Sequence, residues 1–293
     1  MLPREKDDIE NWLLLGVLTL IWGTSYILIK KALIVFSPVQ VTAMRISLSF
    51  IACLPFVPRA IKEIPKTQYL HAAAVGILGT GIPIILFNVS MTRVNSSVSA
   101  IINSLSPLFS VLTGLLFWQL RTTRIKLIGV LVGLVGAMIL VFGKHGWTLT
   151  GDVFYTLLPV IATVCYGTTS NYVKQYFPTT YPLHVTVLSI TAIGPLALVL
   201  LCFSGFSSRL SQPGAMLSLC SVLLLAIFGT VVGWLLFYKL IQRRDALFAT
   251  SVTYLIPIVA IGWGLLDGEG LALYQLGGLA LILTGVYFVS RVK

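Results

Sequence analysis

The feature that most constrains this chain is its series of long apolar runs, which are separated by short polar segments. The run at 12–31, for example, contains no charged residue before its last turn. Runs of about 18 or more apolar residues are typical of helices that cross a membrane. Only 10% of the 293 residues are charged, whereas about 25% is usual for a soluble domain. We therefore predict an all-α integral membrane protein.

We place ten transmembrane helices along the chain. They are expected at 12–31, 38–57, 69–91, 95–118, 124–142, 152–175, 181–204, 215–240, 246–266 and 271–290. The first run is too long for a signal peptide and no small-residue cleavage site follows it, so we interpret it as an uncleaved span. Because ten is an even number, both termini lie on the same side of the membrane.

The distribution of basic residues predicts which side that is. The net charge of +11 could suggest a nucleic-acid partner, but the basic residues lie between apolar runs and form no patch, so we expect none. Fourteen of the 20 Lys and Arg residues fall on the side of the termini, five fall on the other side, and Arg45 lies within the second helix. Cytoplasmic segments carry the excess of basic residues. We expect a multi-pass protein of a bacterial plasma (inner) membrane with both termini in the cytoplasm.

The cysteines and acidic residues favour neither a metal site nor a catalytic site. The four cysteines lie in apolar segments without metal or disulfide spacing, so we expect no metal and no cofactor. None of the nine Asp and Glu residues lies in the middle of a span. His184 is the nearest titratable candidate, but we interpret it as a hydrogen-bonded polar residue near the interface. Asp267 and Glu269 lie in a glycine-rich turn, which suits helix capping better than acid–base chemistry.

The chain also contains an internal repeat. The stretch IWGTSYILIKKA at 21–32 is echoed by CYGTTSNYVKQY at 165–176, and a shift of 144 places Trp22 on Tyr166 and Gly23 on Gly167. Further matches, at shifts of 150 and 149, relate Gly79 and Thr80 to Gly229 and Thr230, Phe87 to Phe237, Pro107 to Pro257, Gly129 to Gly278 and Gly136 to Gly285. We therefore divide the chain into two five-helix halves, 1–147 and 148–293. Since five is odd, the second half is inverted, which is typical of secondary transporters that bind substrate between their repeats.

Both ends of the chain resemble a known family. The opening LIWGTSYILIKKAL, followed by SPVQVTAMRISLSF, resembles the start of EamA-type members of the drug/metabolite transporter (DMT) superfamily. The segment LIPIVAIGWGLLDGEGLALYQLGGLALILTGVYFV resembles their last two helices. The resemblance covers nearly the whole chain and implies a ten-helix exporter or importer of small metabolites, often amino acids. The family often keeps Glu in both halves, whereas here Trp118 and Gln119 stand where the second half has Gly268 and Glu269.

Two matched prolines indicate where a substrate could bind. Pro107 and Pro257 lie inside the fourth and ninth helices, where proline removes a backbone hydrogen bond and bends the helix. The freed carbonyl must then be satisfied by neighbours or by a water-lined cavity. Breaks at corresponding positions of two halves point to a transporter site. A packing kink without substrate contact is the alternative.

Aromatic and polar side chains near these prolines form our set of candidate substrate-binding residues. Trp22 lies ~15 Å along its helix, which is mid-depth rather than the interfacial belt. Asn95, Ser99 and Asn103 share one helix face because they are spaced by four. Ordinary packing or interhelical hydrogen bonding is the alternative role for these side chains. The candidates are Trp22, Thr24, Asn88, Ser99, Asn103, Tyr166, Trp234, Tyr238, Tyr254, Trp263 and Arg45.

Arg45 is the one clear charge within a predicted span. It could hold a substrate carboxylate or gate the outer mouth, but we favour an arginine that snorkels to the outer headgroups or caps backbone carbonyls. Its counterpart in the repeat is Ser189, so it is not a symmetric structural element. Lys30 and Lys174 end matched helices, where we interpret them as compensation of the helix dipole.

These observations predict a secondary transporter, not an enzyme, that exports small neutral or zwitterionic metabolites such as amino acids by alternating access. We expect a monomer that acts as a facilitator or exchanger, because the spans carry no mid-membrane carboxylate that could take up a proton. An intramembrane lipid-linked group transferase and a drug-efflux carrier are the alternatives. The transferase would need clustered catalytic groups at one membrane face, and the sequence has no His, Asp and Glu cluster.

Overall fold

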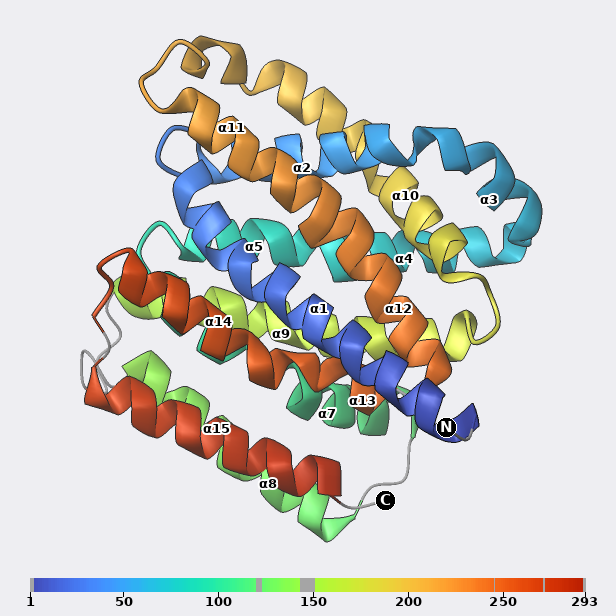
Figure 1. Cartoon of the computed structure of the whole chain (residues 1–293), viewed down its shortest axis with the longest axis vertical. Coiled ribbons are helices and arrows are strands. Elements are labelled where there is room, and N and C mark those ends of the chain that lie inside the picture. The colour runs from blue at the N-terminus through green and yellow to red at the C-terminus, as the bar shows by residue number, and fades with distance from the viewer. Residues whose placement is uncertain (1–2, 120–122, 143–150, 245, 271, 292–293) are drawn as a thin grey trace.

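In the computed structural model, the described part of the chain consists of helices joined by short connections (Figure 1). The structure describes residues 3–119, 123–142, 151–244, 246–270 and 272–291, and no strand occurs among them. The first half forms α1 (Pro3–Ala32), α2 (Pro38–Cys53), η1 (Leu54–Phe56), α3 (Val57–Glu63), η2 (Lys66–Gln68), α4 (Tyr69–Gly76), η3 (Ile77–Gly81), α5 (Ile82–Ser90), α6 (Ser96–Asn103), α7 (Ser106–Trp118) and α8 (Arg124–Phe142). The second half forms α9 (Gly151–Tyr176), α10 (Pro182–Phe203), η4 (Phe206–Arg209), α11 (Ala215–Leu224), η5 (Leu225–Val232), α12 (Gly233–Arg243), α13 (Ala246–Thr250), α14 (Val252–Leu266) and α15 (Leu273–Arg291).

Local sequence signals set several helix boundaries. Ser37 caps α2 in a capping box with Gln40, and Pro38 follows in the first turn, where its missing N–H is not needed. Gly205 and Gly214 lie between α10 and α11 with φ of 66° and 84°. Only a residue without a Cβ adopts this backbone readily, so the two glycines allow the chain to reverse direction there.

Eight helical segments of the described chain are long and apolar enough to cross a membrane. They are Ile9–Ala32, Pro38–Glu63, Lys66–Ser90, Ser96–Trp118, Val153–Tyr176, Pro182–Phe203, Ala215–Arg243 and Phe248–Leu266. α8 and α15 contain shorter apolar stretches, Ile128–Leu140 and Leu273–Gly285. That α8 and α15 also cross, which makes ten spans, stays a prediction. The predicted start of the tenth helix at residue 271 and the division at 147–148 lie outside the described residues.

The predicted fourth and ninth helices are each interrupted. α6 ends at Asn103 and α7 begins at Ser106, so that Pro107 lies in the first turn of a new helix. α13 and α14 are separated at Ser251, whereas Pro257 lies inside α14. The matched prolines therefore mark the right helices, but the ninth helix breaks six residues before its proline.

The main helix contacts stay the same when each helix is replaced by its counterpart in the other half of the chain. α2 packs against α10 and α8 packs against α15, and each of these pairs joins counterpart segments of the repeat. α1 packs against α14, and the corresponding segments α9 and α7 pack likewise. In Figure 1, α8 and α15 lie side by side at one edge of the molecule, with α2, α10 and α11 at the opposite edge. A buried hydrophobic cluster contains residues of α1, α4, α9, α10 and α12 and packs these helices against one another.

Matched glycines occupy the close contact between α8 and α15. A Cβ added to Gly136 would lie 2.8 Å from the carbonyl oxygen of Gly278, and one added to Gly285 would lie 2.4 Å from that of Gly129. These distances are too short for any side chain, so the two backbones touch. Each helix therefore contributes one glycine of each matched pair to the contact.

A second matched pair brings the central helices together. A Cβ on Gly23 of α1 would lie 2.5 Å from the side chain of Val259 in α14. A Cβ on Gly167 of α9 would lie 2.6 Å from the backbone of Phe109 in α7. The matched glycines Gly23 and Gly167 thus allow these helices to approach closely.

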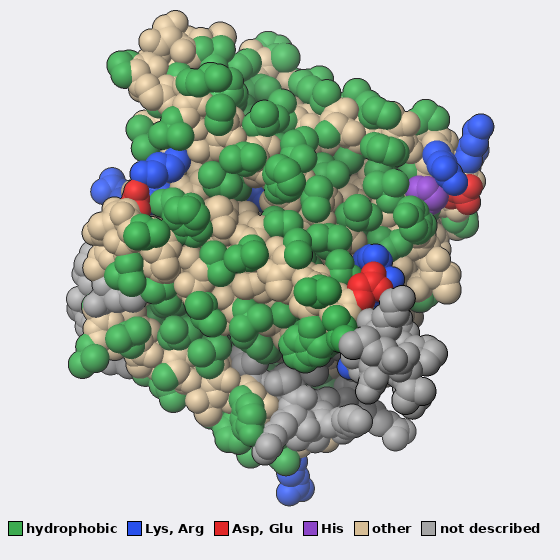
Figure 2. All heavy atoms as spheres, in the orientation of Figure 1, with side chains coloured by type: hydrophobic (Ala, Val, Ile, Leu, Met, Phe, Trp, Pro, Cys, Tyr) green, Lys and Arg blue, Asp and Glu red, His purple; other side chains and the backbone are tan. Residues whose placement is uncertain are grey.

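The surface is that of a membrane protein. In Figure 2, hydrophobic side chains are spread over the whole visible face, whereas charged side chains are few and lie mainly toward its margins. Phe203 at the end of α10 is 86% exposed and Leu273 at the start of α15 is 85% exposed. Soluble proteins rarely expose an apolar surface of this extent. With several membrane-length helices, the chain is a multi-pass membrane protein.

Candidate functional site

The residues that precede Pro257 form one side of the site. Proline lacks the amide that would bond the carbonyl four residues earlier, so Pro257 leaves the carbonyl of Thr253 without its helical donor. Ser104, at the break between α6 and α7, donates its hydroxyl to Thr253 O at 2.7 Å. The broken fourth helix thus supplies the bond that the ninth helix lacks.

The equivalent group in the first half is satisfied locally. Pro107 leaves the carbonyl of Asn103 without its helical donor, and Ser106 Oγ donates to that oxygen at 2.8 Å. We expected either neighbours or a water-lined cavity to satisfy the freed carbonyls, and neighbouring hydroxyl groups do so at both prolines. Asn103 and Thr253, which carry these carbonyls, face the same cavity.

Two π-helical turns lie at matched positions of the repeat. η3 and η5 contain the matched Gly-Thr pairs, and single π-turns within α-helices are frequent at functional sites. In η5 the carbonyl oxygen of Gly229 accepts a hydrogen bond from Trp22 Nε1 at 3.1 Å. The hydroxyl of Thr230 accepts one from Arg45 Nε at 2.8 Å. The π-turn therefore positions a tryptophan of α1 and an arginine of α2.

A cavity of about 80 Å³ lies where these groups meet. Its wall combines apolar and aromatic surface with a few polar groups, which is usual for a small-molecule site. The lining residues come from both halves of the chain and are Trp22, Ser25, Tyr26, Ile29, Arg45, Ile84, Phe87, Asn103, Ser106, Tyr166, Gly229, Trp234, Phe237, Thr250 and Thr253.

Aromatic rings make up a continuous part of this wall. The ring centroids of Trp22 and Trp234 are 5.6 Å apart, and those of Trp234 and Tyr166 are 5.9 Å apart. Tyr166 lies 6.1 Å from Phe87, which meets the edge of Tyr26 at 5.9 Å. Rings at these separations support one another. The cavity therefore presents a fixed aromatic surface to anything that enters it.

Five of the eleven candidate binding residues line the cavity. They are Trp22, Arg45, Asn103, Tyr166 and Trp234, from five different helices that are distant in the sequence. The repeat and the mid-depth argument thus selected residues that the fold brings together. Their contact with a substrate stays a prediction.

Four other candidates lie outside the cavity wall, namely Tyr238, Asn88, Thr24 and Trp263. Tyr238 packs against the cavity residue Trp234, with centroids 5.3 Å apart. The amide of Asn88 donates to a hydroxyl of α2 at 2.8 Å. Trp263 donates to Thr24 Oγ1 at 3.1 Å and is 41% exposed, so this pair lies on the outer surface of α1 and α14.

Ser99 and Tyr254 also lie outside the wall. Their hydroxyl oxygens are buried and have no hydrogen-bond partner among the described residues. Each belongs to a helix that contributes a neighbouring residue to the cavity, respectively Asn103 and Thr253. These two candidates therefore lie behind the wall of the site.

Sequence reasoning missed several lining residues. Phe87 and Phe237 were recognised as a matched pair of the repeat but not as binding residues, although both line the cavity. Ser25 and Ile29 follow Trp22 at helical spacing on one face of α1. The internal match and the helical spacing were the signals that could have identified them.

Arg45 does not snorkel to the outer headgroups, so this form of our preferred interpretation was wrong; the acceptor of its Nε is a side-chain hydroxyl and not a backbone carbonyl. The residue is only 8% exposed, and its guanidinium lies at the cavity. The hydroxyl of Thr230 holds its Nε from the opposite half of the chain. Depth along a helix could not reveal this contact, because it depends on how the halves pack.

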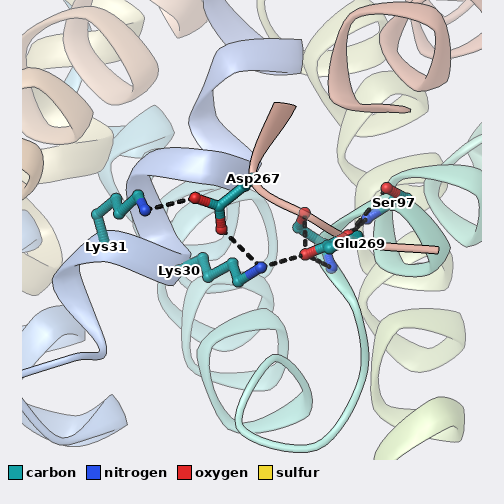
Figure 3. A network of polar contacts seen from close by, with 6 residues as sticks. Lys30, Lys31, Ser97, Asp267 and Glu269 are labelled. Carbon is teal, nitrogen blue, oxygen red and sulfur yellow. Dashed lines mark hydrogen bonds and ion pairs between the residues drawn. The ribbon is translucent and has the colours of Figure 1, made fainter. Parts of the chain in front are cut away.

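An ion-pair network lies at the end of α1 (Figure 3). Lys30 Nζ is 2.7 Å from Asp267 Oδ2 and 2.9 Å from Glu269 Oε1, and Lys31 also pairs with Asp267. Lys30 therefore forms specific ion pairs, beyond the dipole compensation that we predicted. Hydrogen bonds from the two lysines hold the pKa of Asp267 below its usual value.

Glu269 belongs to the same network and caps a helix of the other half. Its carboxylate accepts the backbone N–H and hydroxyl groups of Ser96 and Ser97, at 2.8 to 3.2 Å. Burial by itself raises the pKa of Glu269, but the hydrogen bonds from Lys30, Ser96 and Ser97 together lower the pKa below its usual value. The prediction that this acidic turn serves helix capping is confirmed, although the capped helix is α6.

The opposite end of α1 carries a smaller set of ion pairs. Glu10 lies 2.8 Å from Arg243 Nη1 and 3.4 Å from Lys239 Nζ, at the end of α12. Charged contacts thus connect α1 to the second half at both of its ends, and the cavity lies between them.

The fold and this cavity define a class of multi-pass membrane protein with an interior cavity lined by both halves of the chain. The sequence profile of the EamA-like transporter family matches the chain twice, over residues 11–142 and 153–291. The chain therefore belongs to the EamA-like transporter family, which confirms the resemblance to drug/metabolite transporters.

Similar proteins of nearly the same length carry transporter names. An "Uncharacterized transporter" of Archaeoglobus fulgidus is 25% identical over 96% of this chain and 99% of its own length. The "Uncharacterized inner membrane transporter YedA" of Escherichia coli K12 is 25% identical over 95% and 90%. A "Probable amino-acid metabolite efflux pump" of Salmonella typhimurium is 23% identical over 92% and 91%. A solved crystal structure shares the fold, with a TM-score of 0.62 over 96% of both chains at 15% identity.

Proposed function

We propose that this protein exports small neutral or zwitterionic metabolites, such as amino acids, by alternating access. The observation that carries the proposal is the central cavity, because its aromatic, amide and hydroxyl wall is built from both halves of the chain. Such a wall suits an organic solute of modest size. The name of the Salmonella relative supports both an amino-acid-like substrate and the direction of transport.

The structural correspondence between the two halves supports alternating access. The family profile matches each half separately, and the π-turns η3 and η5 lie at matched positions. The main helix contacts also stay the same when each helix is replaced by its counterpart in the other half. In inverted-repeat transporters one half rocks against the other around a central site. We assign the halves to 1–147 and 148–293, with all ten helices crossing the membrane.

The chemistry of the cavity supports a facilitator or exchanger. Proton-coupled carriers usually place a titratable carboxylate within the membrane. No described acidic residue lines this cavity, and the paired residues Glu10, Asp267 and Glu269 lie at or beyond the ends of the membrane-length segments. Transport is therefore expected to continue without a proton gradient.

Both termini are assigned to the cytoplasm on the basis of the basic residues. In a variant free of native cysteines, Ser208→Cys should react with an impermeant maleimide added outside intact cells. Lys62→Cys should react only after the cells are opened. The reverse pattern would contradict this orientation.

The alternatives make different demands on the molecule. A lipid-linked group transferase needs clustered catalytic side chains, and the described residues bring no three of His, Cys, Asp and Glu together in a metal-binding arrangement. A drug-efflux carrier would also suit an aromatic cavity, and it differs in carrying bulky apolar solutes. Competition between an amino acid and such a solute separates these two transport functions.

A substitution in the cavity tests the proposed site. Trp22→Ala removes a ring that contacts Trp234 and the donor to Gly229 O, so uptake into proteoliposomes should fall about tenfold or more, which corresponds to ~1.4 kcal/mol of lost binding. Trp12→Ala is the matched control, since Trp12 lies on the same helix and is 63% exposed. Asn103→Ala should resemble Trp22→Ala. Unchanged uptake by correctly folded Trp22→Ala and Asn103→Ala would contradict the site.

A further inference from the structure

The cavity contains a buried positive charge without a counter-ion. Arg45 is the only charged residue in its wall, and no described acidic side chain lies there. The ion pairs within the described part of the chain involve other lysines and arginines, near the two ends of α1. A guanidinium in a poorly hydrated interior is costly unless an anion or hydrogen-bond acceptors accompany it.

The geometry leaves most of the guanidinium available to a ligand. Of its five N–H groups, one at Nε donates to Thr230 Oγ1. No described protein acceptor is found for the other four. Nη2 lies close to Gly229, at 3.2 Å from the position of a hypothetical Cβ, so that glycine keeps space free beside it. The fork is therefore anchored at one nitrogen and open at the others.

The repeat shows that the fold does not require this charge. The counterpart of Arg45 is Ser189 in α10, which packs beside η3 as α2 packs beside η5. The described chain thus builds the same π-turn and the same helix contact once with a cation and once without. Arg45 is for that reason better explained by a ligand than by the architecture.

A carboxylate is the ligand group that matches these features. Arginine binds carboxylates through two parallel hydrogen bonds from its planar fork, and a carboxylate would also neutralise the buried charge. The aromatic wall of Trp22, Tyr166 and Trp234 would then contact the rest of the molecule. The ammonium group of an amino acid, by contrast, would find no acidic side chain among the described residues of this wall.

We propose that Arg45 is the residue that selects the substrate, and that it selects a carboxylate attached to an apolar or aromatic body. The inference rests on the proposed transport function and redefines its substrate class: it excludes uncharged solutes, which would leave Arg45 without an anion, and it admits carboxylates that lack an amino group. The amino group of an amino acid is dispensable for recognition. Phenylalanine and its analogue phenylpropionate are therefore both ligands, and phenylalaninamide is not.

Binding is tested with those three probes on the purified full-length protein, as a ligand-induced rise in thermal midpoint. The two carboxylates should bind wild type about tenfold or more tightly than the amide. Arg45→Gln should abolish this preference, and Arg45→Lys, which keeps the charge but loses the fork, should keep part of it. Arg209→Gln is the matched control, since Arg209 is exposed on η4. The thermal midpoints without ligand show whether each variant is folded.

The results separate the two proposals. Equal binding of phenylalaninamide and phenylalanine to wild type would overturn the role of Arg45, and so would a carboxylate preference that survives in folded Arg45→Gln. Absence of binding by both carboxylates at millimolar concentration would also overturn it. Carboxylate binding without flux in proteoliposomes would instead contradict the transport function and leave the role of Arg45 intact.

Discussion

At the scale of single residues, Glu269 connects three parts of the molecule through one carboxylate. It accepts hydrogen bonds from Ser96 and Ser97 at the start of α6, and it pairs with Lys30 at the end of α1. Its side chain is only 5% exposed. Water therefore cannot replace these partners, and the loss of the carboxylate leaves several donors unsatisfied.

Glu269→Gln should lower the stability of the protein. An amide keeps one acceptor oxygen but presents an N–H₂ group to the Ser96 and Ser97 donors, so we expect a loss of about 1–3 kcal/mol. The measurement is the thermal midpoint of the purified protein. Glu63→Gln is the control, because Glu63 is exposed on α3 and should show no change. Equal midpoints for Glu269→Gln and wild type would contradict the capping role.

The same network predicts how stability depends on pH. The folded-state pKa of Glu269 lies below its usual 4.5 and that of Asp267 below its usual 3.8. Groups with lowered pKa stabilise the folded state fully above the unfolded value and lose that effect as pH falls through the folded value. The difference in midpoint between wild type and Glu269→Gln should therefore shrink below about pH 4.5. A difference that grows on acidification would contradict the shift.

Sequence reasoning was more successful for the cavity than for the network. Trp22 and Tyr166 could be selected because the repeat matches them and both lie at mid-depth. The partners of Lys30 could not be predicted, because Asp267 and Glu269 are far away in the sequence and meet it only through packing. The counter-ion of a helix-end lysine is a tertiary property.

At the scale of helices, Pro257 and Ser104 form a testable pair. Ser104→Ala removes the hydroxyl that donates to the carbonyl of Thr253, which should cost about 1–3 kcal/mol of stability. Pro257→Ala restores a backbone N–H to that carbonyl, so Ser104→Ala should cost much less in the Pro257→Ala background. Thermal midpoints of the four variants of this cycle give the coupling. The same cost of Ser104→Ala in both backgrounds would contradict the account.

The contact between α8 and α15 gives a second prediction for helices. Gly285→Ala would place a methyl group 2.4 Å from the carbonyl oxygen of Gly129, and the resulting strain should lower stability by about 1–3 kcal/mol. Gly277→Ala on the same helix meets no atom within 4 Å. This control should leave the thermal midpoint unchanged or raise it slightly, because alanine favours the helix. Tolerance of both substitutions would contradict the close contact.

The patterns that predicted the helices also explain what they could not predict. Apolar runs located the helical segments, and the prolines identified the two that are interrupted. The π-turns η3 and η5 leave no mark on hydrophobic periodicity, since one extra residue in a fully apolar helix exposes no polar group. The break at Ser251 was likewise not predicted, because no proline or glycine stands there.

At the scale of the whole molecule, the repeat places one asymmetric charge inside a nearly symmetric framework. The paired helices, glycines and π-turns of the two halves correspond, whereas Arg45 faces the cavity from one half only. A sequence shift could reveal the correspondence of the halves. The cavity itself required the structure, because its walls come from residues of ten different elements.

The central claim is that the two halves carry a small metabolite across the membrane without a proton gradient. The most direct measurement is counterflow of labelled phenylalanine into proteoliposomes that contain the purified protein and unlabelled phenylalanine, before and after nigericin collapses the pH gradient. We predict uptake above that of protein-free liposomes, at the same rate in both conditions. Uptake that stops when the gradient is collapsed, or that never exceeds the protein-free control, would contradict the account.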